Sequence, residues 1–444
     1  MATEKAYIAA TRFGYGPRPG DLQKIDADPK GWLRRQIGDL SVPPRLKQLE
    51  ASHNHLAEMF RQQGNAGTFG KFLRGTAFDV LAKEVGGRTN AAIESDVPFR
   101  ERLVHFWSNH FTVSAKRPQI AIAVGAFERE AVRPHIFGRF ADLLVSVTQH
   151  PVMLIYLDNF ISFGPNSLGG RHRDVGLNEN LAREILELHT LGVDGGYTQD
   201  DVIELAKLIS GWSVQRPQDP SGVGTDGAFV FRPYGHEPGR KRLLDKTYRG
   251  KTIDQGEQAL RDLAAHPSTA HFIATKLARH FVADEPTPET VTRLETVFRN
   301  TDGDLRALTE ALIEEPEIWD APLSKFKTPK DLLISSFRAL NAKNLPNKAI
   351  VSALSLMNQY PFMAPSPAGW SDQTADWMAP ESLMTRIEWI RAVGKRAPVP
   401  NPLEWADSFM GPVLSDETKQ TISQAESRSE AVALVFSSPE FQRK

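Results

Sequence analysis

The chain has 444 residues, of which 41% are hydrophobic and 24% charged, an ordinary composition for a globular protein with a substantial core. Its 53 Lys and Arg residues nearly balance its 54 Asp and Glu residues, so the formal net charge of -1 gives no overall reason to expect a nucleic-acid partner. The lack of cysteine excludes disulfides, thiolate metal sites and a cysteine nucleophile.

The start of the chain contains no apolar stretch of the kind found in a secretory signal. No segment approaches the roughly 18 consecutive apolar residues that a membrane-spanning helix needs. The sequence as written therefore predicts a cytoplasmic protein without a membrane span, with export alongside a partner as the alternative.

Helical periodicity dominates the chain up to about Asn159, and Pro and Gly clusters interrupt it. Short helices joined by tight loops predict a compact all-α body. The helices predicted in this part span 5–12, 20–25, 30–37, 44–62, 69–84, 98–111, 120–132 and 137–148.

The predicted helix over 98–111 places Arg102, His105 and Asn109 on one polar edge. His105 and His110 are separated by about 140° around the helix, unlike the i, i+4 histidine pair of a zinc-binding helix. Two interpretations stay open for this helix. It is either an aromatic core helix whose histidines satisfy hydrogen bonds, or one wall of a binding site.

The segment over 178–212 is predicted to form two helices joined by a Gly-rich turn. Thr198 and Asp201 form a capping-box pattern that starts the second helix. In the first helix, apolar side chains occupy one arc and polar side chains the opposite arc. The polar arc consists of Glu179, Asn180, Arg183, Glu184, Glu187 and Thr190.

This polar arc also has two interpretations. A solvated surface would be stabilised by the pair of Glu179 and Arg183, which contributes a few tenths of a kcal/mol. A functional site is the alternative, because asparagine competes with the helix backbone for hydrogen bonds and is a poor choice for a merely solvated helix. Glu184 and Glu187 also lack a matching lysine on that face.

The chain loses its helical period on either side of this segment. Residues 160–177 are rich in Gly, Ser and Asn, which predicts a long loop. Residues 228–231 are the best strand candidate, and we predict that they pair with residues near 242–244 as a small hairpin. His236 precedes a basic run over 240–251 that would attract an anionic ligand, although a solvated hairpin explains the run equally well.

The rest of the chain returns to helical patterns. An irregular segment over 361–380 holds four prolines with Trp370 and Trp377, and it either plugs the core or lines a sugar-type pocket. The main helices predicted here span 253–264, 268–281, 288–299, 305–314, 330–342, 349–357 and 381–393.

Short motifs are distributed along nearly the whole chain. They are Arg12 to Gly16, Phe106 to Phe111, Asn178 to Asn180, Ala182 to Glu184, Glu187 to Leu188, Thr190 to Gly192, Gly196 to Thr198, Gly211 to Trp212, His236, His266 to Ala270, Asp304 to Leu305, Lys327 to Pro329 and Gly369 to Trp370. Together they resemble the signature of a bacterial family of uncharacterised proteins, the domain-of-unknown-function family 1800.

This resemblance implies no particular activity, because none is assigned to the family as a class. Genes of the family often neighbour those of a second, sulfatase-like family, which implies a two-protein system with a sulfatase-like partner. Members often carry export signals, so the lack of one here is a departure from the family pattern.

The sequence predicts an all-α fold, a compact multi-helix unit with one small β-hairpin decoration. The unit covers residues 1–444, with a division into lobes 1–212 and 253–444 around an irregular segment 213–252 as a further hypothesis. No cofactor is required by the sequence. A divalent metal such as Mg, Ca or Mn would suit the available oxygen ligands.

The first functional hypothesis is a hydrolase- or transferase-type enzyme acting on a polar or anionic small molecule or a glycan. Glu184 and Glu187 would act as acid and base, and Arg183 would orient a carboxylate or bind substrate. The hydrogen-bonding residues of this site would be Asn180, His105, Asn109 and His236. The second hypothesis is a non-catalytic helical partner protein, in which the same residues form a buried polar network.

Overall fold

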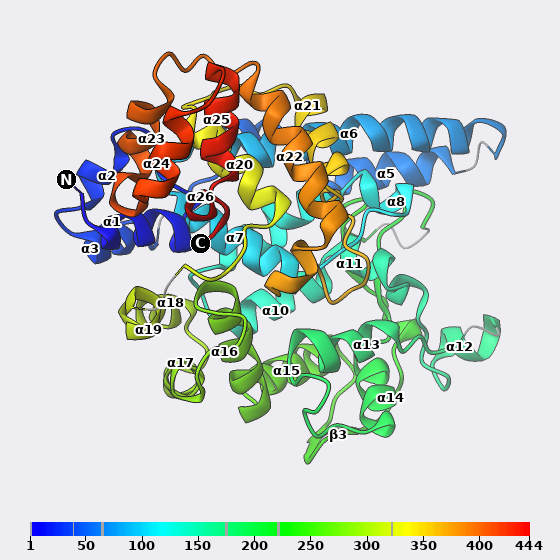
Figure 1. Cartoon of the computed structure of the whole chain (residues 1–444). Coiled ribbons are helices and arrows are strands. Elements are labelled where there is room, and N and C mark those ends of the chain that lie inside the picture. Colours follow the sequence, from blue (N-terminus) through cyan, green and yellow to red (C-terminus); the bar gives the residue numbers. More distant parts are fainter. Residues whose placement is uncertain (1, 39, 64–65, 174–175, 220–222, 321–322) are drawn as a thin grey trace.

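The computed structural model describes residues 2–38, 40–63, 66–173, 176–219, 223–320 and 323–444. Its secondary structure is almost entirely helical, with two small antiparallel sheets (Figure 1), which confirms the predicted fold class. Across these described ranges, no helix combines the length and apolarity needed to cross a membrane. Residues 174–175 of the predicted loop and residues 220–222 of the predicted linker lie outside the described residues.

The two ends of the chain pack together at one side of the molecule (Figure 1). The hydroxyl of Tyr7 donates to the backbone carbonyl of Glu440 at 3.2 Å. The division into two lobes stays a prediction. The N-terminal elements are α1 (Glu4–Ile8), the π-helical η1 (Ala9–Phe13), α2 (Asp21–Ile25) and α3 (Pro29–Arg34), and the C-terminal elements are α23 (Pro402–Met410), η8 (Gly411–Val413), α24 (Asp416–Ser423), α25 (Arg428–Ser437) and α26 (Pro439–Gln442).

The helix predicted over 69–84 is considerably longer in the structure, where α6 spans Ala66–Glu94. Its added turns pack against α21 (Asn347–Leu356), and Gly86 of α6 permits this approach. A Cβ atom at Gly86 would lie 1.9 Å from the side-chain oxygen of Asn347. The glycines that would weaken an isolated helix therefore mark a helix contact here. The helix predicted over 44–62 is wrong as one element, because it divides into α4 (Pro44–Lys47) and α5 (Ser52–Gln62).

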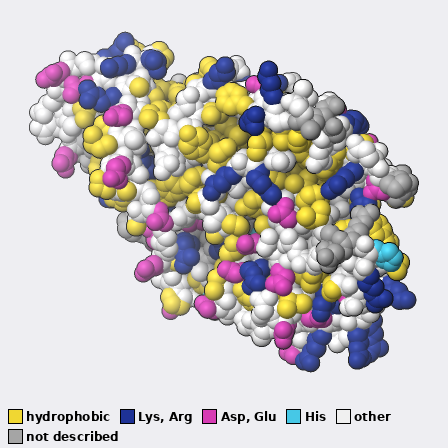
Figure 2. Space-filling model, turned by 90° about the vertical axis from the view of Figure 1, so that its right-hand side faces the viewer, with side chains coloured by type: hydrophobic (Ala, Val, Ile, Leu, Met, Phe, Trp, Pro, Cys, Tyr) yellow, Lys and Arg dark blue, Asp and Glu magenta, His cyan; other side chains and the backbone are white. Residues whose placement is uncertain are grey.

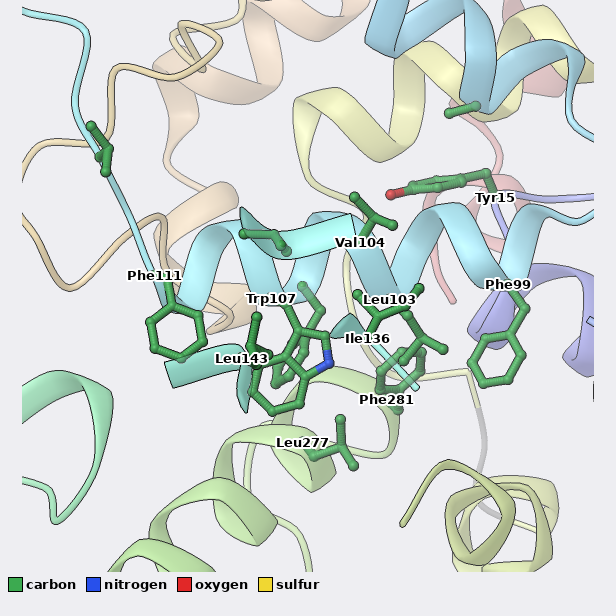
Figure 3. Packing of buried hydrophobic residues seen from close by; sticks show 14 of the residues in the cluster. Tyr15, Phe99, Leu103, Val104, Trp107, Phe111, Ile136, Leu143, Leu277 and Phe281 are labelled. Atoms are coloured by element: carbon green, nitrogen blue, oxygen red, sulfur yellow. The ribbon is translucent and has the colours of Figure 1, made fainter. Parts of the chain in front are cut away.

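Helix α7 (Pro98–His110), which confirms the helix predicted over 98–111, runs through the centre of the fold. Figure 3 shows its apolar face packing on residues of α16 (Pro267–Phe281) and on Leu143 of α10 (Phe140–Gln149). The rings of Phe99 and Phe281 meet edge to face at 6.0 Å, and Trp107 is 2% exposed. Burying each such side chain stabilises the fold by roughly 1.5–3 kcal/mol. This core fixes the helix whose opposite edge carries His105.

The helix predicted over 120–132 breaks into shorter pieces. Ala123 leaves the helical conformation with φ -139°, and Pro134 lacks the amide needed to continue the last turn. The elements of this region are α8 (Pro118–Ala121), α9 (Val124–Phe127), the π-helical η2 (Glu128–Val132), the 3-10 helix η3 (Arg133–His135) and α11 (Pro151–Tyr156).

The central polar segment forms two helices, as predicted, but the first one changes pitch. Helix α13 (Asn180–Glu184) continues as the π-helical η5 (Ile185–His189), which alters the angular spacing that a regular helical wheel assumes. The capping box of Thr198 and Asp201 starts α14 (Gln199–Leu208), which confirms that prediction. The predicted loop over 160–177 contains a 3-10 turn, η4 (Asn159–Ile161), and a short helix, α12 (Leu168–Arg173).

The strand pairing predicted for residues 228–231 is wrong. Strand β2 (Phe229–Phe231) pairs with β1 (Trp212–Val214), whereas β3 (Lys241–Leu243) pairs with β4 (Lys246–Tyr248). The second hairpin is closed by a two-residue turn in which Leu244 has φ 51°. Hairpin turns of this kind favour Asn or Gly at positive φ, so a leucine there concealed the turn. A 3-10 turn, η6 (Pro233–Gly235), follows β2.

The second half agrees with the predicted helices to within a few residues. Its elements are α15 (Asp254–Ala264), α16, α17 (Pro288–Asn300), α18 (Leu305–Glu314), α19 (Pro316–Asp320), α20 (Pro329–Ala339), α21, the 3-10 helix η7 (Thr374–Trp377) and α22 (Pro380–Gly394). Between α21 and α22 the chain is irregular apart from η7, as predicted. This irregular segment and the first turn of α20 reach the polar edge of α7.

Candidate functional site

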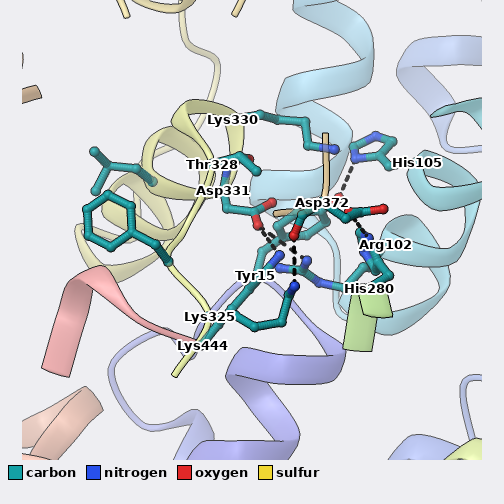
Figure 4. Close-up of polar contacts among 12 residues, drawn as sticks. Tyr15, Arg102, His105, His280, Lys325, Thr328, Lys330, Asp331, Asp372 and Lys444 are labelled. Atoms are coloured by element: carbon teal, nitrogen blue, oxygen red, sulfur yellow. Dashed lines mark hydrogen bonds and ion pairs between the residues drawn. The ribbon is translucent and has the colours of Figure 1, made fainter. Parts of the chain in front are cut away.

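A pocket lies where α6, α7, α16 and the first turn of α20 meet the irregular segment 359–372. Its cavity has a volume of about 80 Å³, room for a small polar group rather than for a whole drug-sized ligand. Figure 4 shows polar side chains from these separate elements converging. The lining residues that carry chemistry are Arg88, His105, Ser108, Asn109, His280, Thr328, Lys330, Asp331, Ser371 and Asp372.

His280 and Asp372 form a hydrogen-bonded pair on one side of this pocket. The distance from His280 Nδ1 to the Asp372 carboxylate is 2.7 Å. Burial lowers the pKa of His280, so its ring is neutral near pH 7. Burial alone would raise the pKa of Asp372, but the charge that His280 carries at acidic pH, its hydrogen bond and the charges of Lys444 and Lys325 hold that pKa below its usual value. A neutral ring beside a carboxylate donates from Nδ1, which leaves a lone pair on Nε2.

His105 carries the opposite tautomer. Its Nδ1 contacts the hydroxyl of Tyr15, and burial raises the pKa of that phenol while it lowers the pKa of His105 well below its ordinary value. Both groups are therefore neutral near pH 7. Among the described residues the Tyr15 hydroxyl has no other acceptor, so it donates to Nδ1 and the proton of His105 sits on Nε2.

The two histidines therefore offer complementary atoms to one pocket. In the described part of the chain, Nε2 of His105 and Nε2 of His280 are both buried without a hydrogen-bond partner. Other buried side chains of the described residues also lack a partner, Nδ1 of His110 and of His189 among them, so these two atoms are distinguished by belonging to residues of one pocket lining. One Nε2 is a hydrogen-bond donor and the other an acceptor.

Lys330 adds a positive charge to the same pocket. Its side chain extends toward His105 in Figure 4, and burial lowers its pKa to about 7. The adjacent Asp331 is already neutralised, because Arg102 lies 3.4 Å and Lys444 2.5 Å from its carboxylate. The pocket thus combines a proton acceptor, a donor and a cation.

Asn109 builds the pocket wall. Its side-chain amide donates to the carbonyl of Trp370 at 2.8 Å, and its side-chain oxygen accepts from the amide of Trp370, also at 2.8 Å. The preceding Gly369 has φ +87°, and a Cβ atom there would lie 2.5 Å from the backbone oxygen of Asn109. Trp370 lines the pocket, whereas Trp377 is buried. The aromatic segment therefore fills both of the roles considered for it, as pocket wall and as core.

The predicted residues of the central helix lie elsewhere. Glu184 and Glu187 are half-buried, and burial followed by the charge of Glu187 raises the pKa of Glu184. Arg183 lies 3.2 Å from Glu179, as predicted, and Asn180 is exposed. The pocket lining includes His105 and Asn109 but none of these four predicted site residues of the central helix. Their catalytic and binding roles stay predictions.

The two helices that carry the predicted residues do meet at one point. Nε2 of His110 lies 3.1 Å from the backbone oxygen of His189, which joins the end of α7 to the end of η5. Both histidines are buried in an aromatic cluster with Phe111. Of the two interpretations of this helix, the aromatic core therefore describes His110, and the wall of a binding site describes His105.

His236 also lies outside the pocket, and both of its ring nitrogens have partners. Nδ1 lies 2.9 Å from the carbonyl oxygen of Ser210, and Nε2 lies 3.2 Å from the ammonium of Lys241. This network fixes β3 against α15 through Gln255, whose side-chain oxygen is 3.0 Å from Nε2. Its polar atoms are used within the fold.

A search of the described residues found no group of three or more His, Asp or Glu side chains placed to hold a metal ion. The predicted divalent metal stays a prediction without a ligand set.

Sequence reasoning missed Tyr15, His280, Lys330 and Asp372. A signal was present, because the motif at 12–16 contains Tyr15, the motif at 327–329 adjoins Lys330, and the motif at 369–370 ends two residues before Asp372. Far apart in sequence, these motifs converge on one pocket in space. His280 lies on the regular amphipathic helix α16, where nothing local distinguishes it from a core residue.

A family model described as "Protein of unknown function (DUF1800)" matches residues 8–443. A search of curated proteins and a search of solved structures each found no match.

Proposed function

Because the chain belongs to the DUF1800 family, which brings no assigned reaction with it, we propose from the site itself that the protein is an enzyme of hydrolase or transferase type. In this proposal His280 is the general base and His105 is the hydrogen-bond donor to the charge that develops on the substrate. The observation that carries it is the pair of buried, unpartnered Nε2 atoms, of opposite hydrogen-bonding character, at one pocket.

The proposed reaction begins when Nε2 of His280 accepts a proton from water or from a substrate hydroxyl as that oxygen attacks. Asp372 stabilises the imidazolium that forms, and it also fixes the ring tautomer. The buried Nε2–H of His105 donates to the oxygen that becomes negative, and such a bond is stronger at a buried atom than in water. The protonated His280 then returns its proton to the leaving group.

This proposal keeps the reaction class predicted from the sequence, a hydrolase or transferase, but gives the role of the base to His280 instead of to Glu184 or Glu187. The glutamate pair also has a property of acid and base residues, because the pKa of Glu184 is raised by burial and then by Glu187. However, neither glutamate lines the pocket in which the unpartnered donor and acceptor lie. A glycan or another polar substrate stays compatible with the half-buried Trp370 in the wall.

The test is turnover of a panel of chromogenic esters, glycosides, phosphate monoesters and sulfate monoesters by the wild type and by two variants. We expect turnover of at least one class, with a loss of 100-fold or more in His280→Ala and little change in Glu184→Gln. Full activity in His280→Ala would contradict the assignment. Loss only in Glu184→Gln would return the role to the glutamates.

A second candidate function, that of a non-catalytic partner of a sulfatase-like protein, is favoured by one observation. An apolar groove lies between α20, α21 and α22, with Leu340, Ile350 and Val393 in its walls. Leu356 beside it is 48% exposed, and Figure 2 shows hydrophobic side chains gathered over one face of the molecule. Exposed apolar areas of this kind mark binding surfaces. Copurification of a partner that is lost on Leu356→Glu, with no turnover of any substrate, would favour this candidate.

A further inference from the structure

Of the two Lys and Arg side chains in the described pocket lining, Lys330 is the one that forms no ion pair with a carboxylate among the described residues. Arg102 and Lys444 share Asp331, whereas Lys325 lies 2.6 Å from Asp284. Arg88, the other cation of the lining, lies 2.7 Å from Glu128. Burying a charge without a partner is costly, and proteins rarely retain one without a use.

The position of Lys330 adds a second reason to expect a negative ligand. Lys330 is the second residue of α20, an eleven-residue helix whose positive end faces the pocket through Thr328, Lys330 and Asp331. The backbone amide of Lys330 is already used, because it donates to the side-chain oxygen of Gln359 at 2.7 Å. The ligand would therefore be held by side chains, with the helix end contributing its field.

Three donors are then available to one anion. They are the ammonium of Lys330, the Nε2 proton of His105 and the hydroxyl proton of Thr328, whose oxygen accepts from the amide of Asp331 at 3.2 Å. The carboxylates of Asp331 and Asp372 also line the pocket, but the first has two cationic partners and the second is bonded to His280. The side of the pocket near Lys330 thus has donors and positive charge in excess.

We propose that the pocket binds a tetrahedral oxyanion, the phosphate or sulfate group of an anionic ester, with Lys330 as its principal ligand. The proposal rests on the proposed function and names its substrate class. The anion forms an ion pair with the ammonium of Lys330 and accepts a hydrogen bond from Nε2 of His105. This arrangement would place the ester bond next to Nε2 of His280. Hydrolysis would transfer the phosphoryl or sulfuryl group to water, with His280 taking the proton of the water and returning it to the alcohol that leaves.

The experiment is isothermal titration of the full chain with sodium sulfate, sodium phosphate and sodium acetate at pH 6.5 and constant ionic strength. We expect saturable binding of sulfate or phosphate, at least tenfold tighter than that of acetate, and the tighter of the two identifies the ester. Lys330→Met should weaken this binding at least tenfold. Because the substitution removes a half-buried cation that forms no ion pair, the variant should stay folded, which its circular dichroism spectrum would verify.

Two further variants separate this proposal from the proposed function. Lys207→Met removes another half-buried lysine, on α14 and outside the pocket lining, and it should bind the anion like the wild type. His280→Ala should keep anion binding while losing turnover. Absence of saturable sulfate and phosphate binding, or equal binding by Lys330→Met, would overturn the anion site while leaving the base assignment standing. Retained turnover in His280→Ala with intact anion binding would overturn the base assignment and leave the anion site standing.

Discussion

The pocket lined by His105 and His280 and the polar arc on α13 and η5 both gather polar side chains. The two regions differ in whether the polar atoms of these side chains have hydrogen-bond partners. On the arc, Arg183 pairs with Glu179 and Asn180 faces solvent. In the pocket, two buried imidazole nitrogens have no partner among the described residues. Polar composition alone therefore does not identify a site. Buried polar atoms that lack a hydrogen-bond partner and belong to residues lining a pocket identify a site better than polar composition does.

The sharpest test of this comparison is to substitute one residue in each region and to compare the effects on kcat. His280→Ala should lower kcat by roughly 100- to 10,000-fold, the usual contribution of a general base, because it removes the lone pair of Nε2. Glu184→Gln should change kcat by less than about threefold. Initial rates on the substrate class found in the panel would measure both. Comparable losses in the two variants would mean that the two regions form one site.

The second prediction concerns the wall of the pocket. Asn109→Ala removes two hydrogen bonds at once and leaves the amide and carbonyl of Trp370 without partners, so we expect a loss of about 2–3 kcal/mol in the free energy of unfolding. Asn180→Ala, on the exposed arc, is the matched control and should change it by less than about 0.5 kcal/mol. Urea unfolding followed by tryptophan fluorescence would compare the two. Equal stabilities would show that Asn109 does not fix the wall.

The third prediction concerns the tautomer of His105. Tyr15→Phe removes the hydroxyl that donates to Nδ1, so the proton of His105 is free to move from Nε2. We expect kcat to fall about tenfold, equivalent to about 1.4 kcal/mol, with KM for the substrate changed less. Nitrogen-15 NMR of the histidine ring reports the tautomer directly. An unchanged Nε2–H signal in the variant would disprove the role assigned to Tyr15.

Much of the fold followed from the sequence because it depends on local signals. The capping box of Thr198 and Asp201 and the Pro-initiated helices of the second half were predicted within a few residues. The exceptions depend on distant contacts. Gly86 lies inside a long helix because Asn347 packs against it, and Leu244 adopts a turn conformation that its side chain disfavours.

The site was harder to predict than the fold. His105 and Asn109 were found because they share one helical edge, which a wheel displays. His280 and Asp372 are 92 positions apart, and their 2.7 Å hydrogen bond has no counterpart in the local pattern of either residue. The central glutamates were favoured for the opposite reason, since they are adjacent on one helix. Their proximity in sequence is what suggested an acid and base pair, and that role stays a prediction.

The smallest expected effect concerns these glutamates and whether they are scaffold or site. Burial, followed by the charge of Glu187, raises the pKa of Glu184, so the folded chain binds that proton more tightly than the unfolded chain does. The pair therefore stabilises the fold less as the pH rises from about 4.5 through the raised pKa, and the loss persists at neutral pH. Glu184→Gln should remove this loss, leaving stability at pH 7 unchanged or raised by less than about 1 kcal/mol, and flattening its pH dependence above pH 4.5. Thermal melts of Glu184→Gln and Glu187→Gln between pH 4 and 8 would measure it. If both variants lost about ten degrees or more, on a scale of about 2–4 °C per kcal/mol, the glutamates would be partners in a buried structural network.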